Sequence, residues 1–224
     1  MPRETFHREL QVLQEKVLIM GSLVEKALLD AVQHLKQRNM DGSRRVIAGD
    51  QEINRLRFEI EGEALILIAT QAPMAVDLRN LAAIIEIAAE LERIGDYAKG
   101  IGKINLLIGQ DPLIKPLIDI PRMAEKACDM LRRALQAFIN HDCEAAYAIP
   151  KDDDEVDALY NQVYRELMTF IIADPKVINQ VNYLLWAAHN LERAADRVNN
   201  ICERVIFTVT GELMEIKTSY DEML

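Results

Sequence analysis

Apolar residues recur at every third or fourth position along most of the chain, which is the spacing of one face of an α-helix. The first stripe of this kind predicts a long helix over residues 4–38. Its members are Leu10, Leu13, Val17, Met20, Val24, Ala27, Ala31 and Leu35. A polar cluster around Gly42 then predicts a turn, and further stripes predict helices over residues 43–70 and 73–108. Pro73 would occupy the first turn of the third helix, where proline is tolerated.

The clearest break in the pattern is the segment 109–121, which contains three prolines and one glycine. Beyond it the helical spacing resumes over residues 124–139, and a turn is expected at His141 and Asp142. A second helix is expected over 142–172, with a kink at Pro150. Asp174 and Pro175 are typical of a helix start, and Gly211 is typical of a helix end. The last helix is therefore expected up to about Thr210, with Trp186 in the core.

The two halves of the chain repeat one another in residues as well as in pattern. Residues 91–96 (LERIGD) recur as residues 191–196 (LERAAD), an offset of 192 − 92 = 100. Residues 50–54 recur as 153–157 at an offset of 103, and the prolines 73 and 175 recur at an offset of 102. Such consistent offsets indicate gene duplication. We expect an all-α fold of two tandem, pseudo-symmetric three-helix bundles, with domains 1–110 and 111–224.

Composition narrows the function. The chain of 224 residues has 50% hydrophobic residues, and it contains few helix breakers, with 9 glycines and 7 prolines. Its formal net charge of -10 repels nucleic acids and anionic membranes. The three cysteines form no CxxC pair and are expected to be free thiols. The N-terminal residues lack the apolar core of a signal peptide, so a cytoplasmic location is expected, with membrane contact only through partner proteins.

Paired carboxylates are the candidate chemistry. Glu92 and Asp96 are one helical turn apart, as are Glu192 and Asp196, so each pair shares a helix face that continues a partly buried stripe. The second helix of each half supplies a matching pair, and the full set of candidate metal ligands is Asp50, Asn54, Glu92, Asp96, Asp153, Asp157, Glu192 and Asp196. Converging carboxylates favour a shared cation, and oxygen ligands suit Fe, Mn, Mg or Ca.

Other interpretations of these residues stay open. A single Glu-x-x-x-Asp pair is more often a solvated helix face, and neighbouring arginines such as Arg93 can form only surface salt bridges. His189 is a weaker candidate ligand, because the first half has Ala89 at the equivalent position. The alternative function is a carboxylate-bridged di-metal enzyme, either an oxidase or a phosphoester hydrolase. The acidic helices lack the Glu-x-x-His pairs of di-iron bundles, and the chain has no phosphate-binding loop or nucleophile elbow, which argues against an enzyme.

Several segments resemble the PhoU family, and together they cover the chain from about Phe6 to Gly211. The helix-three motif of residues 89–96 (AELERIGD) and its copy over residues 190–203 carry most of the resemblance. Shorter matching segments are residues 20–25 (MGSLVE), 46–50 (VIAGD), 77–79 (DLR) and 167–169 (LMT).

The resemblance implies a fold, a function and a set of partners. The fold would be two symmetric three-helix bundles whose Glu/Asp-x-x-x-Asp pairs hold metal ions or clusters. Iron is the first candidate, zinc, manganese, magnesium and calcium are alternatives, and the metal would act with or without bound phosphate. The protein would be a negative regulator of phosphate uptake and homeostasis that links the ATPase of the phosphate ABC transporter to a sensor histidine kinase. It would be a homodimer without catalytic activity. Asn54 stands where a carboxylate is common, which weakens the site of the first half.

Overall fold

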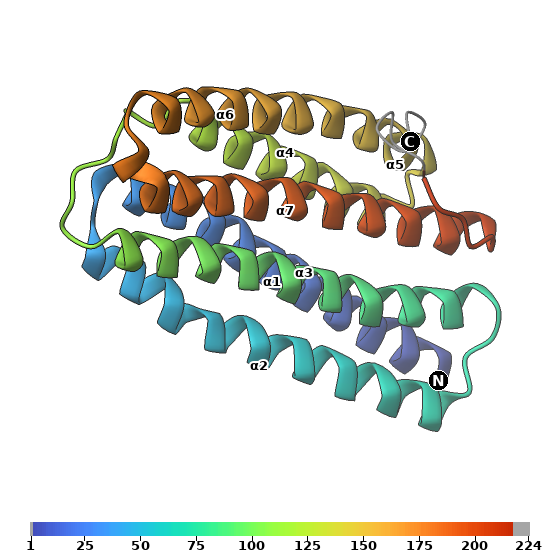
Figure 1. Cartoon of the computed structure of the whole chain (residues 1–224). Helices are drawn as coiled ribbons and strands as arrows, with labels where there is room; N and C mark the ends of the chain where they lie inside the picture. The colour runs from blue at the N-terminus through green and yellow to red at the C-terminus, as the bar shows by residue number, and fades with distance from the viewer. Residues whose placement is uncertain (1, 217–224) are drawn as a thin grey trace.

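The computed structural model describes the backbone of residues 2–216 and the side chains from Glu4 onward, and every regular element in that part of the chain is a helix (Figure 1). The first half comprises α1 (Pro2–Gln37), α2 (Met40–Gln71) and α3 (Val76–Ile108). The second half comprises α4 (Asp119–Asn140), α5 (Cys143–Ala148), η1 (Ile149–Asp152), α6 (Asp153–Ala173), η2 (Pro175–Val177) and α7 (Ile178–Thr210). The predicted all-α fold of six long helices is confirmed.

The start of α3 differs from the prediction. Pro73 lies outside the helix, which begins three residues later at Val76. The reason is the backbone of the preceding loop, because Ala72 and Ala75 both have positive φ angles, of 45° and 49°. Ala72 ends α2 in the left-handed region, where its N–H donates to the carbonyl oxygen of Ile68. Neither residue is in the α-helical conformation, so α3 begins only after Ala75.

The second half departs from a simple three-helix pattern at Pro150. A kink was expected there, but the segment divides into α5, the 3₁₀ turn η1 and α6. Proline lacks the N–H that the helix interior needs, so the tighter turn takes its place. Asp153 is thereby the first residue of α6. The ends of α7 follow the prediction more closely, because Asp174 caps η2 through Lys176 N and Gly211 closes α7 with a φ of 80°.

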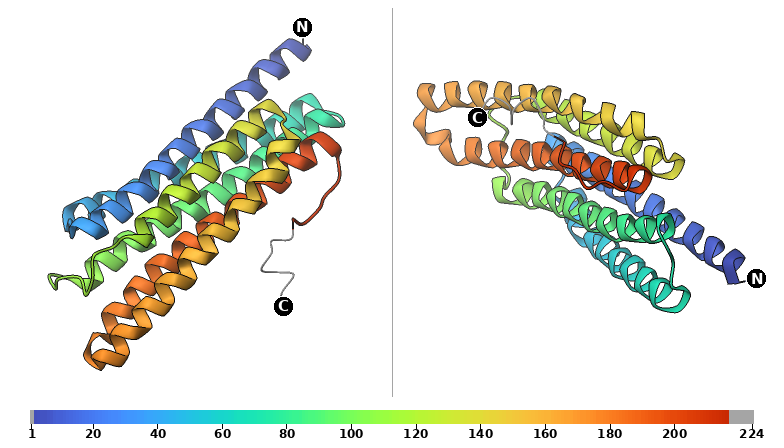
Figure 2. Two further views of the ribbon diagram at one scale, coloured as in Figure 1. Left: turned by 90° about the horizontal axis from the view of Figure 1, so that it is seen from above. Right: turned by 90° about the vertical axis from the view of Figure 1, so that its right-hand side faces the viewer.

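The two bundles join along α3 and α7, which run side by side in opposite directions (Figure 2). Across this contact, referred to below as the seam, Arg204 Nη1 lies 2.9 Å from Glu86 Oε2, and Arg197 Nη1 lies 3.6 Å from Glu90 Oε2. The apolar face of α3 supplies several of the largest fully buried side chains, namely Leu81, Ile84, Ile87, Leu91, Ile94 and Ile101. The apolar face of α7 is buried against it through residues such as Leu184, Leu191 and Ile201. The seam therefore makes one continuous core of the two halves.

A second contact between the halves brings α1 against α4, and a glycine permits it. Gly21 is buried on α1, and a Cβ atom built there would lie 2.2 Å from Leu135 Cδ1 on α4. By contrast, a Cβ atom at Gly62 on the open face of α2 would meet nothing within 4 Å. The small residue at position 21 thus leaves room for the buried Leu135 side chain of α4.

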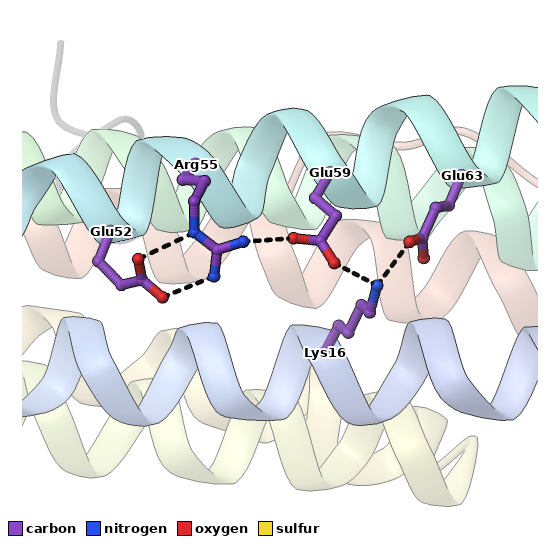
Figure 3. Close-up of polar contacts among 5 residues, drawn as sticks. All are labelled: Lys16, Glu52, Arg55, Glu59 and Glu63. Carbon is purple, nitrogen blue, oxygen red and sulfur yellow. Dashed lines mark hydrogen bonds and ion pairs between the residues drawn. The ribbon is translucent and has the colours of Figure 1, made fainter.

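Ion pairs link α1 to α2 at the periphery. Lys16 Nζ on α1 lies 2.5 Å from Glu59 Oε1 and 2.6 Å from Glu63 Oε1 on α2 (Figure 3). Arg55 extends the row along α2 by bonding both Glu59 and Glu52. Exposed pairs of this kind contribute little to stability, so the network orients side chains around a core that does most of the stabilising.

The expected position of Trp186 is wrong. Its side chain is 56% exposed rather than part of the core. Its neighbours Ala187 and Ala188 take the buried positions on α7, and Tyr183 packs against the Trp186 ring at the surface with ring centroids 5.9 Å apart. The cysteines follow the prediction of free thiols, with Cys128 and Cys202 buried.

The glycine contact gives a testable prediction. Gly21→Val should destabilise the protein by about 1–3 kcal/mol because the added methyl groups overpack the α1–α4 contact. The matched variant Gly62→Val should change stability by no more than about 0.5 kcal/mol, in the stabilising direction, because valine has the better helix propensity. Urea unfolding followed by circular dichroism measures both. Equal effects at the two positions would contradict the role given to Gly21.

Candidate functional site

The candidate residues of the first half meet between α2 and α3. Asp50 on α2 is only 4% exposed, and its Oδ2 atom accepts a hydrogen bond of 2.9 Å from Asn54 Nδ2. Lys99 on α3 donates to the same Asp50 oxygen over 2.6 Å and lies 3.3 Å from Asp96 Oδ1. The ammonium group of Lys99 therefore bridges acidic side chains of both helices.

Glu92 completes this cluster electrostatically. Burial raises the pKa of Glu92, and the negative charges of Asp96 and Asp50 raise it further, whereas Arg57 and Arg93 oppose the rise. The pKa of the Lys99 ammonium group is raised as well, first by its hydrogen bond to Asp50, so the acidic surroundings favour the charged form of Lys99 and disfavour the charged form of Glu92. All four predicted residues of the first half are thus close enough to influence one another, with Lys99 and Arg57 as counter-charges. We refer to these residues as cluster one.

The second half places its candidates between α6 and α7. Asp153 is only 1% exposed, and its Oδ2 atom accepts a hydrogen bond of 2.6 Å from Asn199 Nδ2 on α7. The other carboxylate oxygen, Asp153 Oδ1, is buried and has no hydrogen-bond partner among the described residues. Glu192 Oε2 is also buried and lies 3.1 Å from His189 Nδ1. The sequence indicated His189 only as a weaker candidate ligand, and Asn199 was not among the candidates.

The carboxylates of the second half strongly perturb one another. Burial, followed by the charges of Asp157, Asp196 and Glu192, raises the pKa of Asp153 to about 7, although the hydrogen bond from Asn199 opposes the rise. Burial also raises the pKa of Glu192 to about 7, with Asp196 and Asp157 adding to the effect. All four predicted residues therefore act on a common region, referred to below as cluster two. It holds four carboxyl groups in a partly dehydrated place.

The carboxylates are gathered but not closed into a coordination sphere. Among the described side chains, no three Asp, Glu, His or Cys groups are placed closely enough to hold one metal ion as they stand. Like charges repel, and in both clusters the aspartate oxygens turn instead to an amide or ammonium nitrogen. In chemical kind the donors fit a hard or borderline divalent cation, and the unpartnered Asp153 oxygen is an available ligand atom. Their role as metal ligands stays a prediction.

Sequence reasoning missed Lys99 and Asn199, although a signal was present. Lys99 follows Asp96 by three residues, and Asn199 follows Asp196 by three residues, so both lie on the acidic face of their helix. They also obey the offset of the repeat, because 199 − 99 = 100. Only the structure shows that each side chain reaches across to the first aspartate of its cluster.

The fold and the clusters define a class of protein, namely an internally duplicated helical bundle with an acidic pair on the third helix of each repeat. The family profile described as the PhoU domain matches the chain twice, over residues 17–104 and 120–205. The chain belongs to the PhoU family. The two matches lie on either side of the loop between α3 and α4. Within residues 2–216, no helix combines the length and the apolar character needed to cross a bilayer.

Named relatives match over nearly the whole chain. The phosphate-specific transport system accessory protein PhoU homolog of Caulobacter vibrioides is 38% identical over 210 residues, which cover 93% of this chain and 91% of that protein. The phosphate-specific transport system accessory protein PhoU of Escherichia coli is 34% identical, covering 92% and 86%. The crystal structure of the phosphate transport system regulatory protein PhoU from Streptococcus pneumoniae superposes with a TM-score of 0.87 at 30% identity, covering 94% and 100%.

The buried acids of cluster two predict a pH-dependent stability for the chelator-treated protein. Folding raises the pKa of Asp153 from 3.8 and that of Glu192 from 4.5, each to about 7. Because folding raises both values, this contribution to stability is fully present below about pH 4 and is lost as the pH rises through 7. The loss should be on the order of 3 kcal/mol for the coupled pair.

Chemical unfolding in the presence of chelator, at pH values between 4 and 8, measures this effect. The double variant Asp153→Asn/Glu192→Gln should have a flatter profile than the wild type. The control Glu144→Gln, which removes an exposed carboxylate outside both clusters, should leave the profile unchanged. Identical wild-type and double-variant profiles would contradict the effect assigned to cluster two.

Proposed function

We propose that this protein is a cytoplasmic regulator of phosphate uptake and phosphate homeostasis, acting negatively on the phosphate regulon. The observation that carries this proposal is its match, over more than nine tenths of its length, to relatives named as accessory proteins of the phosphate-specific transport system. Two intact repeats and the shared fold support the same role. The match extends from α1 to α7, so no half of the molecule has been replaced by an unrelated domain.

The proposed physical role is that of an adaptor. A rigid bundle of long helices can present separate faces to two proteins at once, here the ATPase of the phosphate ABC transporter and a sensor histidine kinase. Contact with the membrane would then occur only through these partners, and nucleic acid would not be a ligand because the net charge of -10 opposes it. The homodimer remains a prediction.

Metal binding by the acidic clusters is the second part of the proposal. Cluster two, formed by Asp153, Asp157, Glu192 and Asp196, is supported by the unpartnered buried oxygen of Asp153 and by four convergent carboxyl groups. The equivalent set in cluster one, formed by Asp50, Asn54, Glu92 and Asp96, has the same position in its half. Iron is the first candidate, with zinc, manganese, magnesium and calcium as alternatives. The bound metal, with or without phosphate, would bias which partner binds.

We further propose that the protein is not an enzyme. Its family relatives are named accessory and regulatory proteins. The helices that carry the clusters supply carboxylates but not the Glu-x-x-His pairs of di-metal oxidases. Turnover of a phosphoester or of oxygen by the metal-loaded protein, abolished by Glu192→Ala, would favour the di-metal enzyme instead.

Metal content tests the inorganic part of the proposal. Protein purified without chelator should contain metal by elemental analysis, and Glu192→Ala/Asp196→Ala should lose it because two of the four ligands of cluster two are removed. Adding Fe²⁺, Mn²⁺ or Zn²⁺ to chelated wild-type protein should raise its melting temperature. The control Glu9→Ala/Glu15→Ala removes two exposed carboxylates of α1 and should retain the metal. Metal-free wild type with a melting temperature indifferent to added metal would refute this part.

Partner capture tests the regulatory part. Tagged protein recovered from phosphate-replete and phosphate-starved cells should carry the transporter ATPase and the sensor kinase, identified by mass spectrometry, in amounts that differ between the two conditions. Chelation should change the ratio of the two partners if metal biases their binding. If neither partner is enriched in phosphate-replete or in phosphate-starved cells, the adaptor role is contradicted. If chelation does not change the ratio of the two captured partners, the protein acts as a scaffold whose partner binding is independent of metal.

A further inference from the structure

Equivalent positions of the two clusters differ in charge. At the offset of 100, Lys99 of the first half corresponds to Asn199 of the second. At the offset of 103 that relates Asp50 to Asp153, Arg57 corresponds to Tyr160 (160 − 57 = 103). Both replacements exchange a cation for a neutral group. A third difference has the same sense, because Asn54 of cluster one corresponds to Asp157 of cluster two.

The three differences change the charge of the clusters substantially. Cluster one contains three carboxylates, Asp50, Glu92 and Asp96, and it faces the cations Lys99 and Arg57. Cluster two contains four carboxyl groups and has neither cation at the corresponding positions. Arg93 and Arg193 are equivalent and do not alter the comparison. The same backbone framework thus holds a nearly compensated cluster in one half and a strongly acidic cluster in the other.

The position of Lys99 is the position expected of a bound cation. Its Nζ atom lies between α2 and α3, 2.6 Å from Asp50 Oδ2 and 3.3 Å from Asp96 Oδ1. The Lys99 side chain is 27% exposed, so most of its aliphatic stem is covered while the charged end is directed at the carboxylates. In cluster two the matching contact is an uncharged amide hydrogen bond from Asn199 to Asp153 Oδ2. The second oxygen of each aspartate, Asp50 Oδ1 and Asp153 Oδ1, is buried without a hydrogen-bond partner among the described residues, so the two clusters differ in the charge of the donor and not in this oxygen.

We propose that Lys99 is a built-in cation that replaces metal in cluster one, so that cluster two alone takes up a divalent cation. The inference rests on the metal binding proposed above for cluster two. A metal ion entering cluster one would have to displace a covalently tethered ammonium group from two carboxylates and remain beside its positive charge. At the matching position cluster two has Asn199, whose amide carries no net charge and therefore does not compete with a metal ion as an ammonium group does. The duplicated site has therefore diverged into a self-neutralised copy and a metal-dependent copy.

Isosteric carboxylate variants locate the metal. The probe is Mn²⁺ added to chelated protein, with metal content measured by elemental analysis after dialysis and melting temperature as a second readout. Glu192→Gln/Asp196→Asn should abolish both the bound Mn²⁺ and the thermal shift. Glu92→Gln/Asp96→Asn removes the matched pair of cluster one and should leave both unchanged. Loss of half the metal in this second variant would overturn the inference while leaving the proposed metal function intact.

Reciprocal exchange of the two nitrogen-bearing residues provides an independent test. Lys99→Asn should double the bound Mn²⁺, because it gives cluster one the neutral group of cluster two. Asn199→Lys should abolish Mn²⁺ binding and raise the melting temperature of the chelated protein, as a tethered cation would. If Asn199→Lys does not fold, Lys99→Gln keeps the test decisive through its gain of metal. Unchanged metal content in both Lys99 variants would refute the inference.

Absence of bound Mn²⁺ from the wild type and from Lys99→Asn would have a different meaning. It would remove the proposed metal function of both clusters, and the inference about Lys99 would fail with it. The two failures are distinguishable. If only the inference about Lys99 fails, the wild type still binds Mn²⁺, whereas if the metal function fails, neither the wild type nor any variant binds it. If Lys99→Asn lowers the melting temperature of the chelated protein, that change reports only the loss of the ion pair with Asp50, whichever of the two outcomes holds.

Discussion

The antiparallel packing of α3 against α7 is the constraint on which the rest of the structure depends. Each of these helices contacts its own bundle on one side and the other bundle along the seam, so most of its circumference is buried. Few positions remain for polar side chains, and some of these form ion pairs across the seam while others face α2 in one half and α6 in the other. Glu92 and Glu192 are among those that face the second helix of their bundle. Their charges are therefore held beside the second helix rather than released into solvent.

Periodicity predicted the fold well because long amphipathic helices dominate the chain. Six stripes, the duplication and the glycine at the end of α7 all led to elements that the structure contains. The errors lie where the local backbone conformation determines the structure, as at Ala72 and Ala75, whose positive φ angles delay the start of α3 beyond Pro73. Trp186 was misplaced because its stripe also contains alanines, and small residues can fill the crowded positions of a seam while a large ring stays outside.

The candidate site was predictable as a set of residues but not as an arrangement. Repetition located every acid, and the structure gathers them between the second and third helices as expected. The hydrogen-bond and ion-pair partners of those acids could not be assigned from the sequence. A lysine on a helix face has several possible acceptors, and the sequence alone does not show which one it contacts. Lys99 could have remained with Asp96 on its own helix, yet it reaches Asp50 on α2. Burial of Asp50 explains that choice, since a buried carboxylate requires a partner.

The loop between α3 and α4 joins into one chain two bundles that are arranged like a pair of subunits. Two repeats that pack along antiparallel helices at the seam resemble a dimer whose subunits have been joined end to end. In a dimer of identical chains each substitution appears twice, so neither subunit can change alone. Joining the copies removes that restriction. A lysine at position 99 can coexist with an asparagine at position 199, and the molecule presents two faces of one shape that differ in charge.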